Sequence, residues 1–270
     1  MKPWYYFSIS FALLLFGCES LLTSEQQGGD YPVIIERLTE GERQALTEKY
    51  KTNNDHDFYC ASINEYGLND SKVCPKREIL RVEIKDDEEV RMQNIAAEFL
   101  VRNQEFTNVE EKEQLKIEQS YGLSGCLKCD GSEDDKTTIG WRILYESQTY
   151  EGVNVENSRL MVFLDSEKVY AVNGHWYQEI VIPSIDQLDH DDARELLIGK
   201  EFTYYNWTGK QTITISEDSF EEYQDRVIFP YETEKGLELR VCLVVEAGIW
   251  YFYIDSITGK LVHKKQLITF

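Results

Sequence analysis

Hydrophobic and polar residues alternate along several segments of the chain, which is the pattern of β-strands with one buried face. The alternation is clearest over residues 237–245, where every second residue is leucine or valine. The strands predicted in this way cover residues 115–121, 139–145, 160–164, 169–172, 212–215, 237–245 and 249–254. Turn-length connections such as 150–152 and 165–167 join consecutive strands, and this predicts antiparallel sheets.

Three other segments carry the signals of helices. Thr39 and Glu42 form a predicted capping box, which starts a short helix through residue 50. A longer helix is predicted over 86–103, with an apolar stripe made of Met92, Ile95, Ala96, Phe99 and Leu100. A third helix is predicted to begin at Asp189 and to end at Gly199. The predicted fold class is therefore α+β, with antiparallel sheets packed against a few helices.

The composition indicates a folded, acidic protein. Hydrophobic residues make up 42% of the 270 residues and prolines number only 5, which excludes a disordered chain. The 49 acidic residues outnumber the 28 basic ones, and the formal net charge is −21. Because nucleic-acid binding depends on positive charge that meets phosphate, we expect no nucleic-acid partner.

The N-terminus predicts export. Lys2 precedes an uncharged stretch that ends at Phe16 and is too short to span about 30 Å of hydrocarbon, as in a signal peptide. Residues 15–18 (LFGC) resemble the lipobox of bacterial lipoproteins, which implies that residues 1–17 are removed and that Cys18 carries lipid. An ordinary secretory signal, in which Cys18 has no role, is the alternative. We expect a polar tether over 18–31 and a protein on the periplasmic or surface side of a bacterial membrane, anchored by lipid alone.

The remaining cysteines are odd in number, so one thiol should stay free in an oxidising compartment. Cys242, inside a predicted strand, is the expected free thiol. Of the three possible pairings of the other four, we favour a loop closed by Cys60 and Cys74. Cys126 and Cys129 have the spacing of a redox pair, but the acidic stretch 130–135 follows, and nearby carboxylates raise a thiol's pKa. A structural disulfide is the main prediction there; zinc bound with Cys60 and Cys74, or a redox site, are the alternatives.

Two regions resemble parts of a known family. Residues 140–155 (GWRILYESQTYEGVNV), 159–165 (RLMVFLD) and 169–174 (VYAVNG) are similar to the FTP region in the propeptides of thermolysin-like and fungalysin metalloproteases. Residues 239–245 and 250–260 (WYFYIDSITGK) are similar to the PepSY module that follows it. The resemblance implies PepSY- and cystatin-like units, with an α+β region over 32–185 that ends in FTP-like hairpins and a PepSY-like domain over 186–270. The motif residues are Gln148, Tyr150, Gly152, Asp165, Asn173, Gly174, Trp250, Asp255 and Gly259.

Physical chemistry alone gives these motif residues structural roles. The carboxylate of Asp255 can accept hydrogen bonds from the backbone of the following turn, and Gly259 can adopt positive φ there. Strand alternation places one set of residues in the core and the other on the outside. The expected core residues are Trp250, Phe252 and Ile254, and the expected outward residues are Tyr251 and Tyr253.

The sequence holds no motif of a known catalyst. The family's His-Glu-x-x-His zinc helix is missing, and so are Gly-x-Ser-x-Gly and the P-loop. The four histidines are His56, His175, His190 and His263, widely spaced, and we expect His190 at a solvated helix start rather than at a metal. A calcium site over 130–135 lacks the glycine and glutamate that such loops use, and an acidic solvated loop is expected instead.

We therefore expect a non-catalytic, stand-alone, propeptide-like protein without cofactor or metal. The leading hypothesis is a protein that binds another protein, and the resemblance implies a secreted metalloprotease that it inhibits or chaperones. The alternative is an envelope module that binds a small ligand or glycan through exposed aromatic residues.

Overall fold

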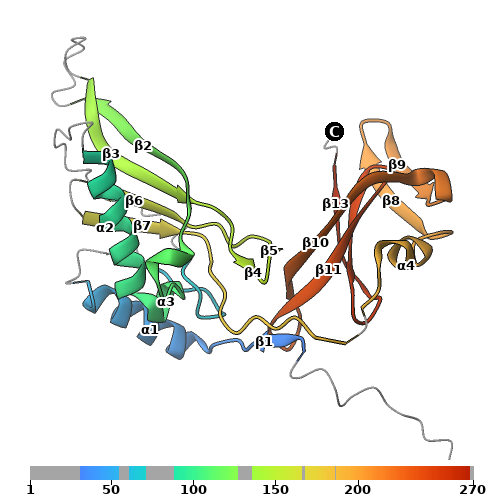
Figure 1. The fold of residues 1–270 in the computed structure, drawn as a ribbon, viewed down its shortest axis with the longest axis horizontal. Helices are drawn as coiled ribbons and strands as arrows, with labels where there is room; N and C mark the ends of the chain where they lie inside the picture. The colour runs from blue at the N-terminus through green and yellow to red at the C-terminus, as the bar shows by residue number, and fades with distance from the viewer. Residues whose placement is uncertain are drawn as a thin grey trace, which may run out of the picture.

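The computed structural model describes residues 31–54, 61–70, 88–126, 136–165, 168–185 and 187–267 (Figure 1). Its fold is α+β, as predicted. The helices are α1 (Glu40–Thr52), α2 (Glu89–Arg102), α3 (Gln104–Thr107) and α4 (His190–Glu195), with short 3-10 turns η2 (Lys112–Gln114) and η4 (Glu217–Ser219). The strands are β1 (Val33–Ile35), β2 (Ile117–Cys126), β3 (Lys136–Tyr145), β4 (Thr149–Tyr150), β5 (Val153–Val155), β6 (Met161–Asp165), β7 (Lys168–Asn173), β8 (Glu201–Asn206), β9 (Gly209–Thr214), β10 (Phe220–Glu232), β11 (Leu237–Ala247), β12 (Trp250–Asp255) and β13 (Leu261–Gln266).

Local capping starts two of the helices where the sequence predicts it. The Thr39 side chain accepts a hydrogen bond from the backbone N–H of Glu42, and the Glu42 carboxylate accepts one from the backbone N–H of Thr39 at 2.8 Å. Asp189 caps α4 in the same way, with the Asp192 carboxylate as the returning partner. Each cap satisfies backbone donors that the first helical turn leaves without a partner.

The first half of the chain forms a four-stranded antiparallel sheet covered by α2. The strand order is β2-β3-β6-β7, and Figure 1 shows α2 running across this sheet with α1 at its lower end. The apolar stripe of α2 meets the alternating residues of β3 and β6. The buried residues of this contact are Met92, Ala96, Phe99, Leu100, Trp141, Ile143, Val162 and Leu164.

A seven-stranded sheet dominates the second half, in the order β13-β12-β11-β10-β5-β4, with β1 also paired to β11. Strands β1, β4 and β5 come from the region before residue 186, so the first half of the chain completes the sheet of the second. The β4–β5 hairpin leaves the first sheet between β3 and β6, and β5 pairs with β10 in parallel. This parallel pair is a difference from the all-antiparallel expectation, because the chain crosses between two sheets at this hairpin.

One side of the seven-stranded sheet is covered by α4 and the β8–β9 hairpin, which Figure 1 shows on the same side. Trp250, Phe252 and Ile254 are buried there, as predicted. The prediction that Tyr253 faces outward is wrong, because Tyr253 is only 4% exposed. It packs on the opposite side of the sheet in a second small cluster. The other buried members of that cluster are Val227, Cys242, Val244 and Val262.

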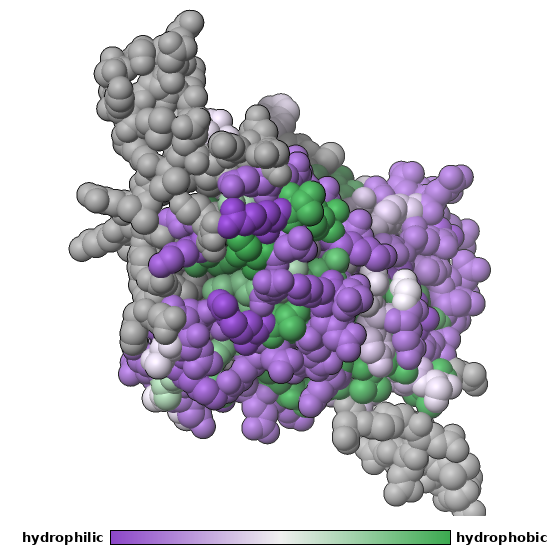
Figure 2. Space-filling model, turned by 60° about the vertical axis from the view of Figure 1, so that its left-hand side comes forward, coloured by the Kyte–Doolittle hydropathy of each residue, from purple (hydrophilic) through white to green (hydrophobic). Residues whose placement is uncertain are grey.

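Strands β1, β4, β5, β8, β10 and β13 are absent from the sequence-based prediction, and β2 continues beyond residue 121 to Cys126. Figure 2 shows a largely hydrophilic surface with separate apolar patches, in keeping with a chain of which 29% is charged. No helix among the described residues is long and apolar enough to cross a membrane.

Candidate functional site

Asp255 ends β12 and organises the turn to β13. Its Oδ1 accepts hydrogen bonds from the backbone N–H groups of Ile257 and Thr258, at 2.9 and 2.8 Å. Gly259 has a φ of 66°, in the left-handed region that the turn requires. The turn that the spacing of Asp255 and Gly259 predicts is confirmed.

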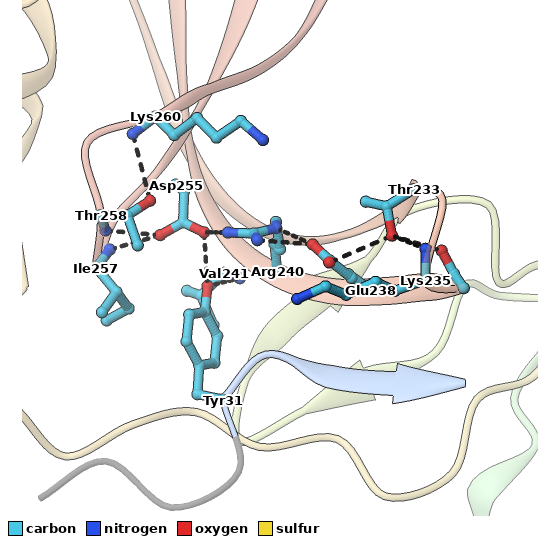
Figure 3. A network of polar contacts seen from close by, with 11 residues as sticks. Tyr31, Thr233, Lys235, Glu238, Arg240, Val241, Asp255, Ile257, Thr258 and Lys260 are labelled. Carbon is cyan, nitrogen blue, oxygen red and sulfur yellow. Dashed lines mark hydrogen bonds and ion pairs between the residues drawn. The ribbon is translucent and has the colours of Figure 1, made fainter. Parts of the chain in front are cut away.

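The other oxygen of Asp255 belongs to a buried polar network that the sequence does not reveal (Figure 3). Asp255 Oδ2 forms an ion pair with Arg240 and accepts a hydrogen bond from the Tyr31 hydroxyl at 3.2 Å. Arg240 also pairs with Glu238 at 2.6 Å. The Tyr31 hydroxyl in turn accepts a hydrogen bond from the Val241 backbone N–H at 2.9 Å. The network thus joins the chain before β1 to strands β11 and β12.

This network has one cation between two carboxylates and almost no contact with water. The side chain of Asp255 has no exposed surface, that of Glu238 is 8% exposed and that of Arg240 is 11% exposed. Burial alone would lower the pKa of Arg240, but hydrogen bonds and charge from Glu238 and Asp255 outweigh it and raise the pKa. Since both oxygens of Asp255 are hydrogen-bonded and buried, the network fixes the fold and offers no acid or base to a substrate.

The FTP-like motif is held by a second set of buried contacts. The side-chain amide of Gln148 donates to the backbone carbonyl of Tyr177 at 2.7 Å and accepts from the Tyr177 backbone N–H at 3.0 Å. The backbone N–H of Gln148 donates to the Ser158 hydroxyl at 2.7 Å. These contacts attach the start of the β4–β5 hairpin to the segment that leads from β7 toward α4.

The other motif residues lie at separate places in the fold. Gly152 forms the β4–β5 turn with a φ of 79°, and Tyr150 packs beside it on the core of the large sheet. Asp165 is buried at the end of β6, whereas Asn173 ends β7 and Gly174 follows it. Trp250 is buried under the Lys264 side chain, whose Nζ lies 4.3 Å from the ring centroid. The structure therefore does not bring the motif residues together into one pocket.

The predicted cysteine chemistry lies mostly outside the described residues. This holds for Cys18, Cys60, Cys74 and Cys129, and for the acidic stretch 130–135. The backbone of Cys126 ends β2, but its side chain is not among the described parts of the structure. The disulfide, zinc and redox alternatives for these positions remain predictions.

Cys242 is a free and buried thiol, as predicted. Burial, followed by the negative charge of Asp255, raises its pKa far above the ordinary thiol range. We expect native protein to leave Cys242 unlabelled by iodoacetamide at pH 8, and urea-unfolded protein to label it fully. Peptide mapping by mass spectrometry measures this, with glutathione in the same tube as the reactive control; complete labelling of Cys242 in native protein would contradict the result.

The described residues contain no group of three or more side chains placed to hold a metal ion. His190 opens α4, and its Nε2 lies 3.0 Å from the backbone carbonyl of Asp225. This contact and the capping role of Asp189 give both residues a structural role.

The largest feature that sequence reasoning missed is a cluster of rings on the side of the large sheet opposite α4. We call it the aromatic face. It consists of Tyr223, Phe229, Tyr231, Tyr251, Tyr253 and His263, from strands β10, β12 and β13. Ring centroids are 5.0 Å apart for Tyr223 and Tyr251, 4.7 Å for Phe229 and Tyr253, and 5.1 Å for Phe229 and His263. These contacts form two groups of rings, one of Tyr223 with Tyr251 and one of Phe229 with Tyr253 and His263.

Charged groups surround the aromatic face. The Tyr223 hydroxyl donates to Asp225 at 3.3 Å, and the Tyr253 hydroxyl donates to Glu156 at 3.5 Å. The Lys260 ammonium lies 5.1 Å from the centroid of Tyr231. Tyr253 is buried, but Tyr223 remains 44% exposed. An apolar centre with a polar margin is the usual composition of a protein interface.

Part of this surface had a signal in the sequence. The alternation of β12 places Tyr251 and Tyr253 together, opposite Trp250 and Phe252. The β10 residues were missed because β10 itself was not predicted. An aromatic at every second position in residues 229–231, next to a strand with the same pattern, is the signal that could have found them.

Comparisons with known proteins assign no family. No family model matches the chain, and no curated protein matches it. Among solved structures, the Bacillus megaterium YpeB C-terminal domain is similar over 87% of this chain and 100% of that domain, with 12% sequence identity and a TM-score of 0.29. A likeness at this level assigns neither fold family nor function, and the resemblance to FTP and PepSY propeptides stays a prediction.

Proposed function

We propose that this chain is a non-catalytic cell-envelope protein, anchored by lipid on Cys18, which binds a protein partner through its aromatic face. The observation that supports this most is the position of the rings. They lie on the side of the seven-stranded sheet away from α4 and the β8–β9 hairpin, where they pack against one another and against a small apolar cluster that includes Val227, Cys242 and Val244. Tyrosine-rich surfaces of this kind supply much of the binding energy at protein interfaces.

The geometry of the rings favours a protein over a sugar. Tyr223 and Tyr251 are inclined by 41°, and Phe229 and Tyr253 by 45°, so these rings do not share one plane. A sugar ring stacks best on a flat exposed ring, whereas the side chains of a protein partner fill an uneven surface. The resemblance to metalloprotease propeptides makes a secreted metalloprotease the first partner to test, as a target for inhibition or chaperoning.

A different observation favours the second candidate function, glycan binding. Tyr205 and Trp207 are 72% and 85% exposed at the end of the β8–β9 hairpin. Tyr205 lies near the end of β8 and Trp207 in the turn that follows, so the tip of the hairpin offers two exposed rings on which a sugar can stack. These two residues lie outside the aromatic face, so variants separate the two functions.

Affinity capture from the native envelope tests the proposal. The wild-type protein is compared with a Tyr223→Ser/Tyr251→Ser variant and with a Tyr205→Ser/Trp207→Ser control. We expect one protein to be captured by the wild type and the control but lost with the aromatic-face variant. For that protein, purified, the Kd should rise at least about tenfold when the two tyrosines are replaced.

Thermal unfolding of each variant checks that it is folded. Equal capture of the same partner by the wild type and the aromatic-face variant would contradict the proposal. Binding of envelope glycan that only the Tyr205→Ser/Trp207→Ser variant loses would establish the second candidate instead.

A further inference from the structure

The seven-stranded sheet ends in a strand whose charge is opposite to that of the chain. β13 lies at one end of the strand order, so only β12 pairs with it among the described strands. After Asp255 the sequence contains Lys260, His263, Lys264 and Lys265 and no acidic residue, although the chain carries a net charge of −21. The edge strand is therefore a basic segment in an acidic protein.

Among the described residues, no carboxylate pairs with a lysine of this segment. Within the described part of the chain, none of Lys260, Lys264 and Lys265 forms an ion pair. In contrast, Arg194 and Arg240, which also lie in the second half of the chain, both pair with carboxylates. Lys264 lies over the rings of Trp250 and Phe202, at 4.3 and 5.1 Å from their centroids. The rings hold this ammonium group in place and leave its charge available for a ligand.

Successive residues of a strand point to opposite sides of the sheet. Lys264 lies on the side of Trp250, whereas Lys265 is opposite Tyr251 on the side of the aromatic face. An extended segment placed beside β13 would therefore meet a lysine on each side of the sheet. Acidic residues at neighbouring positions of that segment would each lie close to one ammonium group.

We propose that the free edge of β13 binds an extended acidic segment of a protein partner by strand addition. Backbone hydrogen bonds supply part of the affinity, and Lys264 and Lys265 select for acidic side chains. A second copy of the chain is a poor occupant, because antiparallel pairing of two β13 strands brings lysines close to lysines. This inference rests on the proposed function, since it describes one segment of the partner that the neighbouring aromatic face binds.

Lysines on an edge strand also protect it from unwanted pairing. A titration of the full chain with a peptide shows whether these lysines only prevent strand pairing or also bind an acidic segment. The probe is a fluorescent peptide of about eight residues in which Glu and Asp stand at neighbouring positions among Val and Thr, a length that matches a strand. Controls are a peptide with Lys in place of the acids, and an acidic peptide N-methylated at alternate backbone nitrogens.

We expect saturable binding of the acidic peptide, at least about tenfold weaker binding of both control peptides, and a similar loss for Lys264→Glu/Lys265→Glu. Lys200→Glu, an exposed lysine next to β8, makes the same kind of charge change away from β13 and should keep the wild-type affinity. Equal binding of the N-methylated peptide, or an unchanged Kd for the double variant, would overturn the inference. So would a dimer in sedimentation that the double variant loses.

The two proposals fail in different ways. If the aromatic-face variant loses a captured partner while the peptide titration shows no dependence on β13, only the strand-addition inference is wrong. If the peptide binds as expected while the Tyr223→Ser/Tyr251→Ser variant keeps every partner, the aromatic face has been assigned wrongly.

Discussion

Replacing Arg240 with methionine should lower the free energy of unfolding by about 3–5 kcal/mol, the range for removing one partner of a buried ion pair. Methionine keeps much of the volume of the side chain but leaves Asp255 and Glu238 buried without a cation. The loss should appear as a lower urea midpoint and a lower Tm. Because the network also holds Tyr31, the variant should expose the chain before β1 to proteolysis earlier than the wild type.

The matched control is Arg43→Met on α1. Arg43 pairs with Glu40 at 2.6 Å, but the two side chains are 40% and 62% exposed. An exposed pair contributes about 0–1 kcal/mol, so this variant should unfold close to the wild type. Adding Glu238→Gln to Arg240→Met should recover part of the loss by removing a buried charge. Equal destabilisation by Arg240→Met and Arg43→Met would show that the buried network does not stabilise the fold.

Gly174→Ala should destabilise the protein by about 3 kcal/mol or more, at the upper end of the cost of overpacking a core. Gly174 has a φ of 97°, and a Cβ built on it would lie 1.8 Å from the backbone carbonyl oxygen of Arg159. This oxygen belongs to the chain leading into β6 and cannot move as a side chain can. The β6–β7 hairpin must therefore distort to accept a methyl group.

Gly152→Ala separates this clash from backbone strain. Gly152 also has positive φ, at 79°, but no atom lies within 4 Å of its Cβ position. Alanine there should cost only about 1–2 kcal/mol, the penalty for a left-handed conformation. Urea unfolding of both variants measures the difference, and a loss for Gly152→Ala as large as that for Gly174→Ala would contradict the explanation.

Local chemistry made part of the fold predictable. The caps of α1 and α4 involve residues three apart, and the stripe of α2 repeats within one helix, so neighbouring residues alone contain the information. The alternating strands β3, β6 and β12 are predictable for the same reason. Their apolar residues show one buried face without reference to any distant segment.

The missed strands depend on distant partners. β10 contains Glu221 and Glu222 near its start and Pro230 near its end, features that argue against a strand. It forms because β11, largely buried on both faces, pairs with β10 along most of its length. The same double-sided β11 explains the error at Tyr253, because Val244 and Cys242 provide a second core on the side that alternation marks as solvent.

The candidate site likewise contains one part that neighbouring residues predict and one part that depends on distant residues. The turn made by Asp255 and Gly259 follows from their spacing, but the partners of Asp255 do not. Arg240 lies on the neighbouring strand, and Tyr31 comes from the other end of the described chain. Only the sheet topology brings these groups together, and a single sequence does not reveal it.

Hydrogen exchange of the protein with and without its captured partner tests the central claim most directly. We predict that the partner slows exchange in β12 and β13, around Tyr251, Tyr253 and His263, and leaves α2 unchanged. Slowed exchange confined to α2 and the β2-β3-β6-β7 sheet, with β10, β12 and β13 unaffected, would contradict the assignment of partner binding to the aromatic face.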